Sequence, residues 1–457
     1  MRLIFLRRAV AGALAITAVA AAPASAQFSP GSDGLGDPFF PFAGNGGYDV
    51  QHYFLDLDYV RTGNQMDATA TITATATQNL SSFNLDLRGF NISNLDVDGV
   101  DAASSRSGTH ELTVTPASGI QAGREFVVRI DYEGQPQRVI DPDGSSEGWV
   151  LTSDGAHVVN EPQGSPGWYP ANDNPQDKAF YDIAITVPDG ITAIGNGRLI
   201  SETRSGGKTR WHWREDSPMA PYLTTATNGV FEIRVSKWRG KPVYHAVDPT
   251  LNQVAWERLA LEPQVLEFFS KLYGPYPFTS GGGIVDNGFV FYALEVQTRS
   301  VYDRNVNPGT LVHEVAHQWF GNAVTLSTWD EIWLNEGFAT WSEWIWDEEH
   351  GGPTAAETFD ATFESHDDWD RPPLDIGGPA LMFTSPAYDR GAMTLQALRE
   401  KIGDGDFRKI LRAWFRENED GNVTTLDFQA LSERVSGQDL DEFFDVWLRV
   451  PEQPTSW

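Results

Sequence analysis

Two histidines and a glutamate stand at a spacing that suits one metal ion. His313 and His317 flank Glu314 in the motif His-Glu-Val-Ala-His, and a further glutamate, Glu336, follows 19 residues after the second histidine. Residues four apart lie on one face of an α-helix, so a helix over 309–321 can direct both imidazoles toward one cation. Two imidazoles and one carboxylate are typical ligands of a catalytic zinc ion, which keeps a further coordination position open. The sequence therefore predicts one Zn²⁺ per chain, bound by His313, His317 and Glu336.

Glu314 is the candidate for proton transfer at this site. Zinc lowers the pKa of a coordinated water toward ~7. A carboxylate next to a metal ligand can take the proton of that water as it attacks a carbonyl group. Such a set of residues indicates metal-assisted hydrolysis. The alternative interpretation is a pair of hydrogen-bonded core histidines, and the third ligand at Glu336 argues against it.

The hydrophobic periodicity predicts the helices that must position these residues. Asn307 can cap a helix, Pro308 suits its first turn and Gly321 can end it, so we expect a buried helix over 309–321. A second helix over 333–350 would return the third ligand to the histidines. Further helices are expected over 256–274, 391–403 and 407–418, and an extended segment over 281–299.

Upstream of the helices, apolar and polar residues alternate with period two, which is typical of half-buried strands. Clusters of Gly, Asn, Asp and Pro separate the alternating segments. We therefore predict an α+β fold of two domains, with an antiparallel β domain over 48–236, sandwich or barrel-like, and a mainly helical domain over 237–457. Residues 27–47 are expected to form an irregular lead-in. The predicted strands cover 48–60, 67–77, 83–92, 110–115, 125–132, 180–187 and 231–236.

The first 26 residues have the composition of a removable signal peptide. Three arginines within the first eight residues precede a small apolar run, and Ala-Ser-Ala at 24–26 suits cleavage after Ala26. We therefore expect an exported protein, either secreted or periplasmic.

The composition narrows the classes of partner. The chain has 457 residues, with 33 basic and 63 acidic side chains, a net charge of −30 and no cysteine. Nucleic acids and anionic membrane surfaces both require a cationic face, so we expect neither as a partner. No later stretch approaches the roughly 20 apolar residues of a membrane-spanning helix. Without cysteine, disulfides, thiol catalysis and a cysteine-ligated zinc are excluded. A monomer is expected.

Around the metal motif the chain resembles the aminopeptidase N and leukotriene hydrolase family of gluzincin metallopeptidases. The resemblance is carried by HEVAHQWFGN at 313–322, WLNEGFA at 333–339 and PANDNPQDKA at 170–179, and it extends over about 48–450. It implies an N-terminal β saddle packed on a thermolysin-like zinc catalytic domain. It also implies a short form of the family, without the C-terminal helical domain of many members and with a more open active site.

The resemblance also implies roles for three further residues. The family's Gly-Ala-Met-Glu-Asn strand corresponds to Tyr-Ala-Leu-Glu-Val at 292–296, which implies that Glu295 binds the free α-amine of a peptide. Tyr388, in Tyr-Asp-Arg-Gly-Ala, matches the family's Tyr-x-Lys-Gly-Ala and implies a phenol that stabilises the oxyanion. Glu161 falls where relatives place a glutamine near the substrate amine. A carboxylate that pairs with an ammonium would fix the peptide register at one residue.

The side chains that orient the metal-binding imidazoles are harder to predict. A metal-bound imidazole usually donates its second N–H to a carboxylate or a carbonyl. Asp330 and Glu331, on the turn into the helix of Glu336, are the candidates. The alternative is that both are first-turn acids that favour the helix dipole.

Three functions are compatible with these residues. The first is a zinc-dependent aminopeptidase that acts on peptides with a free N-terminus. The second is a zinc endopeptidase with an open cleft, suggested by the altered segment at 292–296. The third is a non-catalytic peptide-binding module, and the intact Glu314 argues against it. Acetylated peptides separate the first two, since only an endopeptidase should cleave them.

Overall fold

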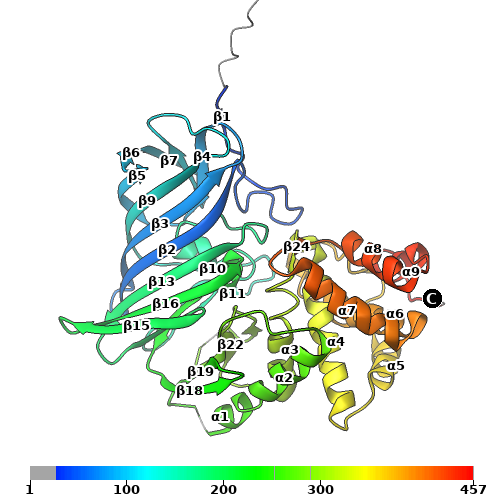
Figure 1. Ribbon diagram of the computed structural model, residues 1–457. Coiled ribbons are helices and arrows are strands. Elements are labelled where there is room, and N and C mark those ends of the chain that lie inside the picture. Colours follow the sequence, from blue (N-terminus) through cyan, green and yellow to red (C-terminus); the bar gives the residue numbers. More distant parts are fainter. Residues whose placement is uncertain (1–26, 252, 289, 456–457) are drawn as a thin grey trace, which may run out of the picture.

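The computed structural model describes residues 27–251, 253–288 and 290–455. The predicted signal peptide over 1–26 lies outside these residues, so its cleavage stays a prediction. Within the described part of the chain, every helix is too short or too polar to cross a membrane. As predicted, a β domain is followed by a mainly helical domain, and the two pack side by side (Figure 1).

An eight-stranded sheet forms the largest part of the β domain. Along β2 (Tyr48–Val60), the first strand of this sheet in the chain, Leu55 and Leu57 are buried while Asp56 and Asp58 face partly outward, as the period-two pattern predicts. The sheet is antiparallel except where β13 (Ala179–Pro188) and β2 (Tyr48–Val60) run parallel. In spatial order the strands are β15 (Arg198–Ser205), β16 (Lys208–Met219), β13, β2, β3 (Gln65–Ala76), β9 (Glu125–Gly134), β5 (Asn91–Val97) and β6 (Val100–Asp101).

Two smaller sheets complete the β domain. The single strand predicted over 83–92 is wrong, because the chain turns near Gly89 and contributes to two sheets. Gly89 has φ +69°, a conformation that favours glycine, and the alternating pattern continues across this turn. The four-stranded sheet has the order β1 (Ser29–Pro30), β4 (Leu80–Asp86), β8 (Glu111–Thr115) and β7 (Ala103–Ser107). The five-stranded sheet has the order β10 (Arg138–Ile140), β11 (Ser146–Leu151), β12 (Ala156–Val159), β17 (Ala226–Gly229) and β14 (Thr192–Gly195).

A mixed five-stranded sheet links the β domain to the helices. The strand predicted over 231–236 forms at one edge of this sheet. The opposite edge strand ends directly before Glu295. The order is β18 (Glu232–Trp238), β19 (Lys241–Val247), β20 (Gly281–Asp286), β22 (Ser300–Asp303) and β21 (Ala293–Leu294).

Nine α-helices lie in the described part of the helical domain. The helix predicted over 256–274 is instead two helices, and the second begins with Pro263 in its first turn, where a missing N–H costs nothing. The helices are α1 (Gln253–Leu259), α2 (Glu262–Leu272), α3 (Pro308–Ala316), α4 (Trp333–Glu349), α5 (Ala355–Ser365), α6 (Gly391–Ile402), α7 (Asp404–Asn418), α8 (Thr425–Ser436) and α9 (Asp441–Leu448).

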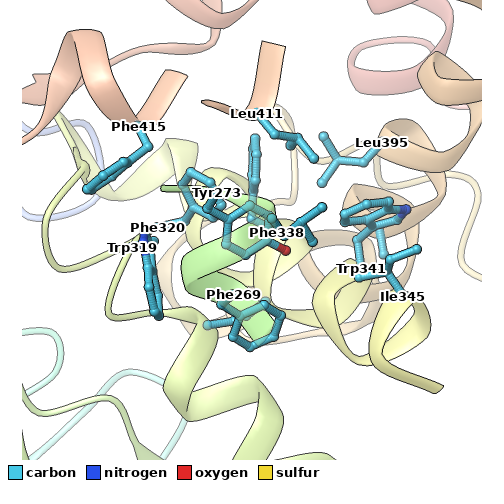
Figure 2. Close-up of a cluster of buried hydrophobic side chains, with 14 of the residues drawn as sticks. Phe269, Tyr273, Trp319, Phe320, Phe338, Trp341, Ile345, Leu395, Leu411 and Phe415 are labelled. Carbon is cyan, nitrogen blue, oxygen red and sulfur yellow. The ribbon is translucent and has the colours of Figure 1, made fainter. Parts of the chain in front are cut away.

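An aromatic core holds α3 and α4 together (Figure 2). Phe320, just after α3, packs against Phe338 of α4 with ring centroids 4.6 Å apart. On its other side, Phe320 contacts Tyr273 at the end of α2, at 4.7 Å. Aromatic pairs of this kind stabilise a core beyond the area that they bury. The two helices that carry the predicted metal ligands therefore have a rigid relative position.

The β domain holds the loop between α3 and α4 at both of its ends. Lys178, from the 170–179 motif, donates from Nζ to the carbonyls of Asn322 (2.9 Å) and Ala323 (3.0 Å). Asp37, from the lead-in, accepts a hydrogen bond from the backbone N–H of Trp329 (2.7 Å). The β domain thus supports the segment that returns the chain from the histidines to Glu336.

Candidate active site

Helix α3 presents both histidines toward one side. Its start matches the prediction, since the Asn307 side chain accepts a hydrogen bond from Thr310 N (2.8 Å) and Pro308 is the first helical residue. The helix ends at Ala316 and not at Gly321 as predicted. His317 still has helical backbone angles (φ −55°, ψ −25°), so its ring lies 4.7 Å from the ring of His313.

Glu336, in the first turn of α4, meets the two imidazoles. Its Oε2 atom lies 3.1 Å from Nε2 of His313 and 3.5 Å from Nε2 of His317. One potential ligand atom from each of the three residues lies within 4.8 Å of the other two, and all three side chains are largely buried. Two imidazole nitrogens and one carboxylate oxygen that converge in this way fit a single Zn²⁺.

The second ring nitrogens are bound by groups other than the predicted ones. Nδ1 of His313 lies 2.8 Å from Oε1 of Glu343, and Nδ1 of His317 lies 3.1 Å from the carbonyl of Phe320. The prediction of Asp330 and Glu331 is therefore wrong. Glu331 instead accepts a hydrogen bond from the first backbone N–H of α8.

Glu343 is a site residue that the sequence reasoning missed. It lies seven residues after Glu336 on α4, which is about two helical turns and therefore the same face. The seven-residue spacing of the two glutamates was the available signal. Asp330 and Glu331 do not reach the histidines because both lie in the short 3₁₀ helix η3 (Trp329–Glu331), which precedes α4 in the chain. The face that meets the histidines belongs to α4.

The residues after the metal motif hold the segment of Glu295. The backbone carbonyl of Glu295 accepts hydrogen bonds from Nε2 of Gln318 (3.1 Å) and Nδ2 of Asn322 (2.7 Å). Gln318 also accepts from Thr298 N at 2.8 Å. These two amides, which the sequence reasoning did not single out, link the position of Glu295 to that of His317.

Glu161 and Glu295 form a pair of buried carboxylates. They are 8% and 2% exposed, and Oε1 of each has no hydrogen-bond partner within the described residues. Burial, followed by the nearby charge of Glu295, raises the pKa of Glu161 well above its ordinary value. Burial raises the pKa of Glu295 as well. Because unpaired buried carboxylates are costly, this pair suits a ligand that carries positive charge.

Tyr388 lines the same cavity as the predicted metal ligands. It lies in a short π-helix, η5 (Pro386–Arg390), a form of backbone that is frequent at functional sites. Its ring is nearly parallel to that of His313, with centroids 5.9 Å apart. Burial raises the pKa of the phenol well above its ordinary value, so the hydroxyl keeps its proton and can donate a hydrogen bond.

Two features fix the position of Tyr388. The guanidinium of Arg390 donates to the carbonyls of Trp369, Val446, Trp447 and Val450, which ties η5 to the end of α9. Helices α4 and α6 also approach closely at their glycines. A Cβ on Gly337 would lie 2.8 Å from the backbone of Gly391, so neither position has room for a side chain.

All seven residues predicted for the site line one cavity of about 520 Å³. Glu314, the predicted base, is 5% exposed, and burial is the main cause that raises its pKa to about 8. The cavity also includes Tyr292, Thr310, Thr340, Glu343 and Trp344. The seven lining residues that the sequence predicted are Glu161, Glu295, His313, Glu314, His317, Glu336 and Tyr388.

Family comparisons agree with this arrangement. Residues 49–223 match the Peptidase M1 N-terminal domain, and residues 284–447 match the Peptidase family M1 domain. The chain therefore belongs to the M1 family of zinc metallopeptidases, as the resemblance in its motifs predicts.

Curated relatives are longer than this chain. Aminopeptidase M1-D of Oryza sativa subsp. japonica is 28% identical over 323 residues, which cover 63% of this chain and 36% of the relative. Aminopeptidase N of Lactococcus lactis subsp. lactis is 27% identical over 320 residues, which cover 63% and 38%. The matched part is thus little more than a third of the length of these relatives.

A solved structure matches almost over its whole length. The M1 zinc metallopeptidase of Deinococcus radiodurans has a TM-score of 0.86 and 27% identity, and the match covers 92% of this chain and 98% of that one. A variant of the same peptidase bound to a Tyr-Ser-Ala substrate has a TM-score of 0.84 and 28% identity, with 92% and 99% covered. The two-domain architecture is therefore shared by both proteins.

The contact of Glu343 with His313 predicts a loss of metal affinity in Glu343→Gln. The amide oxygen of Gln carries no negative charge to balance the imidazole N–H, so we expect zinc to bind about 10- to 100-fold more weakly. Competition with a chromogenic chelator measures the affinity. Glu349→Gln, an exposed position on the same helix, is the matched control. Unchanged affinity in Glu343→Gln would contradict the orienting role.

Proposed function

We propose that the protein is a zinc-dependent aminopeptidase that hydrolyses the N-terminal peptide bond of peptides. The observation that carries this proposal is the pair Glu161 and Glu295, whose unpartnered oxygens line the same cavity as the metal-binding residues. A substrate ammonium bound there would give both carboxylates a partner. With the ammonium bound there, the reacting carbonyl would be that of the same first residue. The Deinococcus relatives bound to Tyr-Ser-Ala and to L-arginine support the same substrate class.

His313, His317 and Glu336 would hold one Zn²⁺ per chain. When bound, the ion supplies a Lewis acid that lowers the pKa of a coordinated water toward ~7. Glu343 and the carbonyl of Phe320 would keep the two imidazoles in the tautomer whose Nε2 atoms are free to bind the metal.

The remaining residues divide the work on the substrate. Glu314 accepts a proton from the attacking water through a carboxylate oxygen and passes it to the nitrogen of the leaving amine. The Tyr388 hydroxyl donates a hydrogen bond to the carbonyl oxygen as negative charge develops there. Glu161 and Glu295 accept hydrogen bonds from the α-ammonium and orient the peptide. The export predicted from residues 1–26 would place this activity outside the cytoplasm, in a monomer.

A smaller cavity of about 140 Å³ adjoins the first and shares Glu161, Tyr292 and Tyr388 with it. Its wall combines aromatic rings with the carboxylate of Asp143, and the described lining of both cavities includes no Lys or Arg. Aromatic faces suit the aliphatic stem of a long cationic side chain, and a carboxylate suits its charged end. We therefore propose that this cavity receives the first side chain of the peptide and favours Arg or Lys there.

A matched pair of peptides, one free and one N-acetylated, tests the aminopeptidase. We expect chelator-sensitive removal of one residue from the free peptide and no cleavage of the acetylated one. Glu295→Gln should lower kcat/KM on the free peptide by about 10- to 100-fold, because a hydrogen bond to a charged group contributes about 1.5–3 kcal/mol. Mass spectrometry of the products decides. Internal cleavage of both peptides would replace the aminopeptidase by the endopeptidase.

Alanine variants of the two α3 and α4 glutamates should separate proton transfer from metal binding. Glu314→Ala should keep its zinc and lose about 10²- to 10⁴-fold in kcat, because only the base is removed. Glu336→Ala should lose the zinc of the catalytic cavity on dialysis as well as activity. Elemental analysis beside turnover on the free peptide gives both quantities. Equal zinc loss in the two variants would refute the separate roles.

Peptides that differ only in their first residue test the smaller cavity. The wild type should have a higher kcat/KM for N-terminal Arg than for N-terminal Glu. Asp143→Asn should reduce that ratio by about 2- to 5-fold, because an exposed ion pair contributes up to about 1 kcal/mol. Asp101→Asn, at an exposed position of β6, is the control. A ratio that Asp143→Asn leaves unchanged would contradict the specificity.

A further inference from the structure

A second group of metal-ligating side chains lies in the β domain. Asp86, His110 and Glu111 each place one potential ligand atom within 4.8 Å of the other two, as do His313, His317 and Glu336. Asp86 is the last residue of β4 and Glu111 is the first residue of β8. None of the three lines the catalytic cavity.

The two carboxylates of this group are a buried pair of like charges. Asp86 and Glu111 are directly opposite each other in the antiparallel pairing of β4 with β8. They are 0% and 8% exposed. Like charges in direct cross-strand register are destabilising, and more so away from water. The charge of Asp33 on the lead-in also acts on Glu111 and has the same sign.

The carboxylate of Glu111 lacks a hydrogen-bond partner among the described residues, whereas that of Asp86 has several. Both carboxylate oxygens of Glu111 have no hydrogen-bond partner among the residues that the structure describes, and Oδ1 of Asn45 has none either. Asp86, by contrast, accepts hydrogen bonds from the backbone N–H groups of Gly44 and Asp173, both at 3.0 Å. A buried carboxylate with both oxygens unpartnered is rare in native proteins and indicates a bound species.

The imidazole of His110 adds a nitrogen ligand to the two carboxylates. Nε2 of His110 lies 4.0 Å from Oδ1 of Asp86 and 2.9 Å from the backbone carbonyl of Phe42. Ligand atoms of one tetrahedral ion, with bonds of about 2.0–2.2 Å, lie roughly 3–4 Å apart. Two carboxylates and one imidazole therefore converge at distances suited to a metal ion, while the Phe42 carbonyl is a hydrogen-bond partner of the imidazole.

We propose that Asp86, His110 and Glu111 bind a divalent transition-metal cation in addition to the catalytic one. The imidazole favours zinc-like ions over Ca²⁺ and Mg²⁺, which prefer sites made of oxygen alone. The cation neutralises the two facing carboxylates and satisfies the oxygens of Glu111.

The position of this site gives the cation a structural role. The lead-in meets two of these residues, since Gly44 N donates to Asp86 and the Phe42 carbonyl lies 2.9 Å from Nε2 of His110. The ion would therefore lie where this irregular segment contacts β4 and β8. The same lead-in provides Asp37, which holds Trp329 just before α4. Binding of the ion therefore stabilises the lead-in and its contact with the helical domain, without contact with the substrate cavity.

Zinc content and thermal unfolding of the full chain test the proposal. We expect two zinc ions per chain in the wild type after equilibration with Zn²⁺ and dialysis. Glu111→Gln should retain one zinc and wild-type peptidase activity. Glu336→Ala, which disables the catalytic site, should also retain one, and added Zn²⁺ should still raise its Tm. That increase should vanish when Glu111→Gln is combined with Glu336→Ala. Glu133→Gln, at an exposed position of β9, is the control.

A second variant tests the site independently, in case Glu111→Gln does not fold. His110 is at the edge of the site and its side chain is 18% exposed, so His110→Gln removes the imidazole with little loss of packing. It should likewise lose one zinc. One zinc in the wild type and none in Glu336→Ala would overturn the proposal. A higher Tm of metal-free Glu111→Gln, with zinc content unchanged, would overturn it too and identify Glu111 as a protonated acid. Zinc counting does not depend on peptidase activity, so the two proposals fail separately.

Discussion

The concentration of buried carboxylates around one cavity is the constraint on which the catalytic domain depends. Glu161, Glu295, Glu314 and Glu336 all line it, and each is at least nine-tenths buried. Carboxylates held so close together repel one another and lose their hydration, so the arrangement is unfavourable unless positive charge enters. The two histidines compensate part of the cost. A metal ion and a substrate ammonium are the natural sources of the rest.

A structure that stores such repulsion needs support from outside the cavity. The aromatic packing of Phe320 with Phe338 holds the two ligand-bearing helices in place. Lys178 ties the β domain to the loop between them. One stretch, 313–322, contributes two metal-binding imidazoles, the candidate base and the two amides that support Glu295. The predicted metal site and the proposed amine site therefore share a single structural element.

Features that depend on local spacing were accessible from the sequence. The metal motif, the cap at Asn307, the family motifs and the order of the two domains are all of this kind. Features set by distant contacts were not. The alternating pattern of 83–92 hides a turn between two sheets, and the pairing of Asp86 with Glu111 depends on strand register. Glu343 was not predicted because Asp330 and Glu331 lie nearer to Glu336 in the sequence, whereas Glu343 shares its helix face only after two turns.

The close contact between Gly337 and Gly391 fixes the spacing of α4 and α6. Here two helices are spaced by backbone against backbone. Glu336 precedes Gly337 on α4, and Arg390, the last residue of η5, precedes Gly391 at the start of α6. Side chains elsewhere on these helices can vary in size without changing the distance across this junction. Substitutions in the cavity wall of this chain should thus leave the reach from the Tyr388 phenol to the Glu336 carboxylate unchanged.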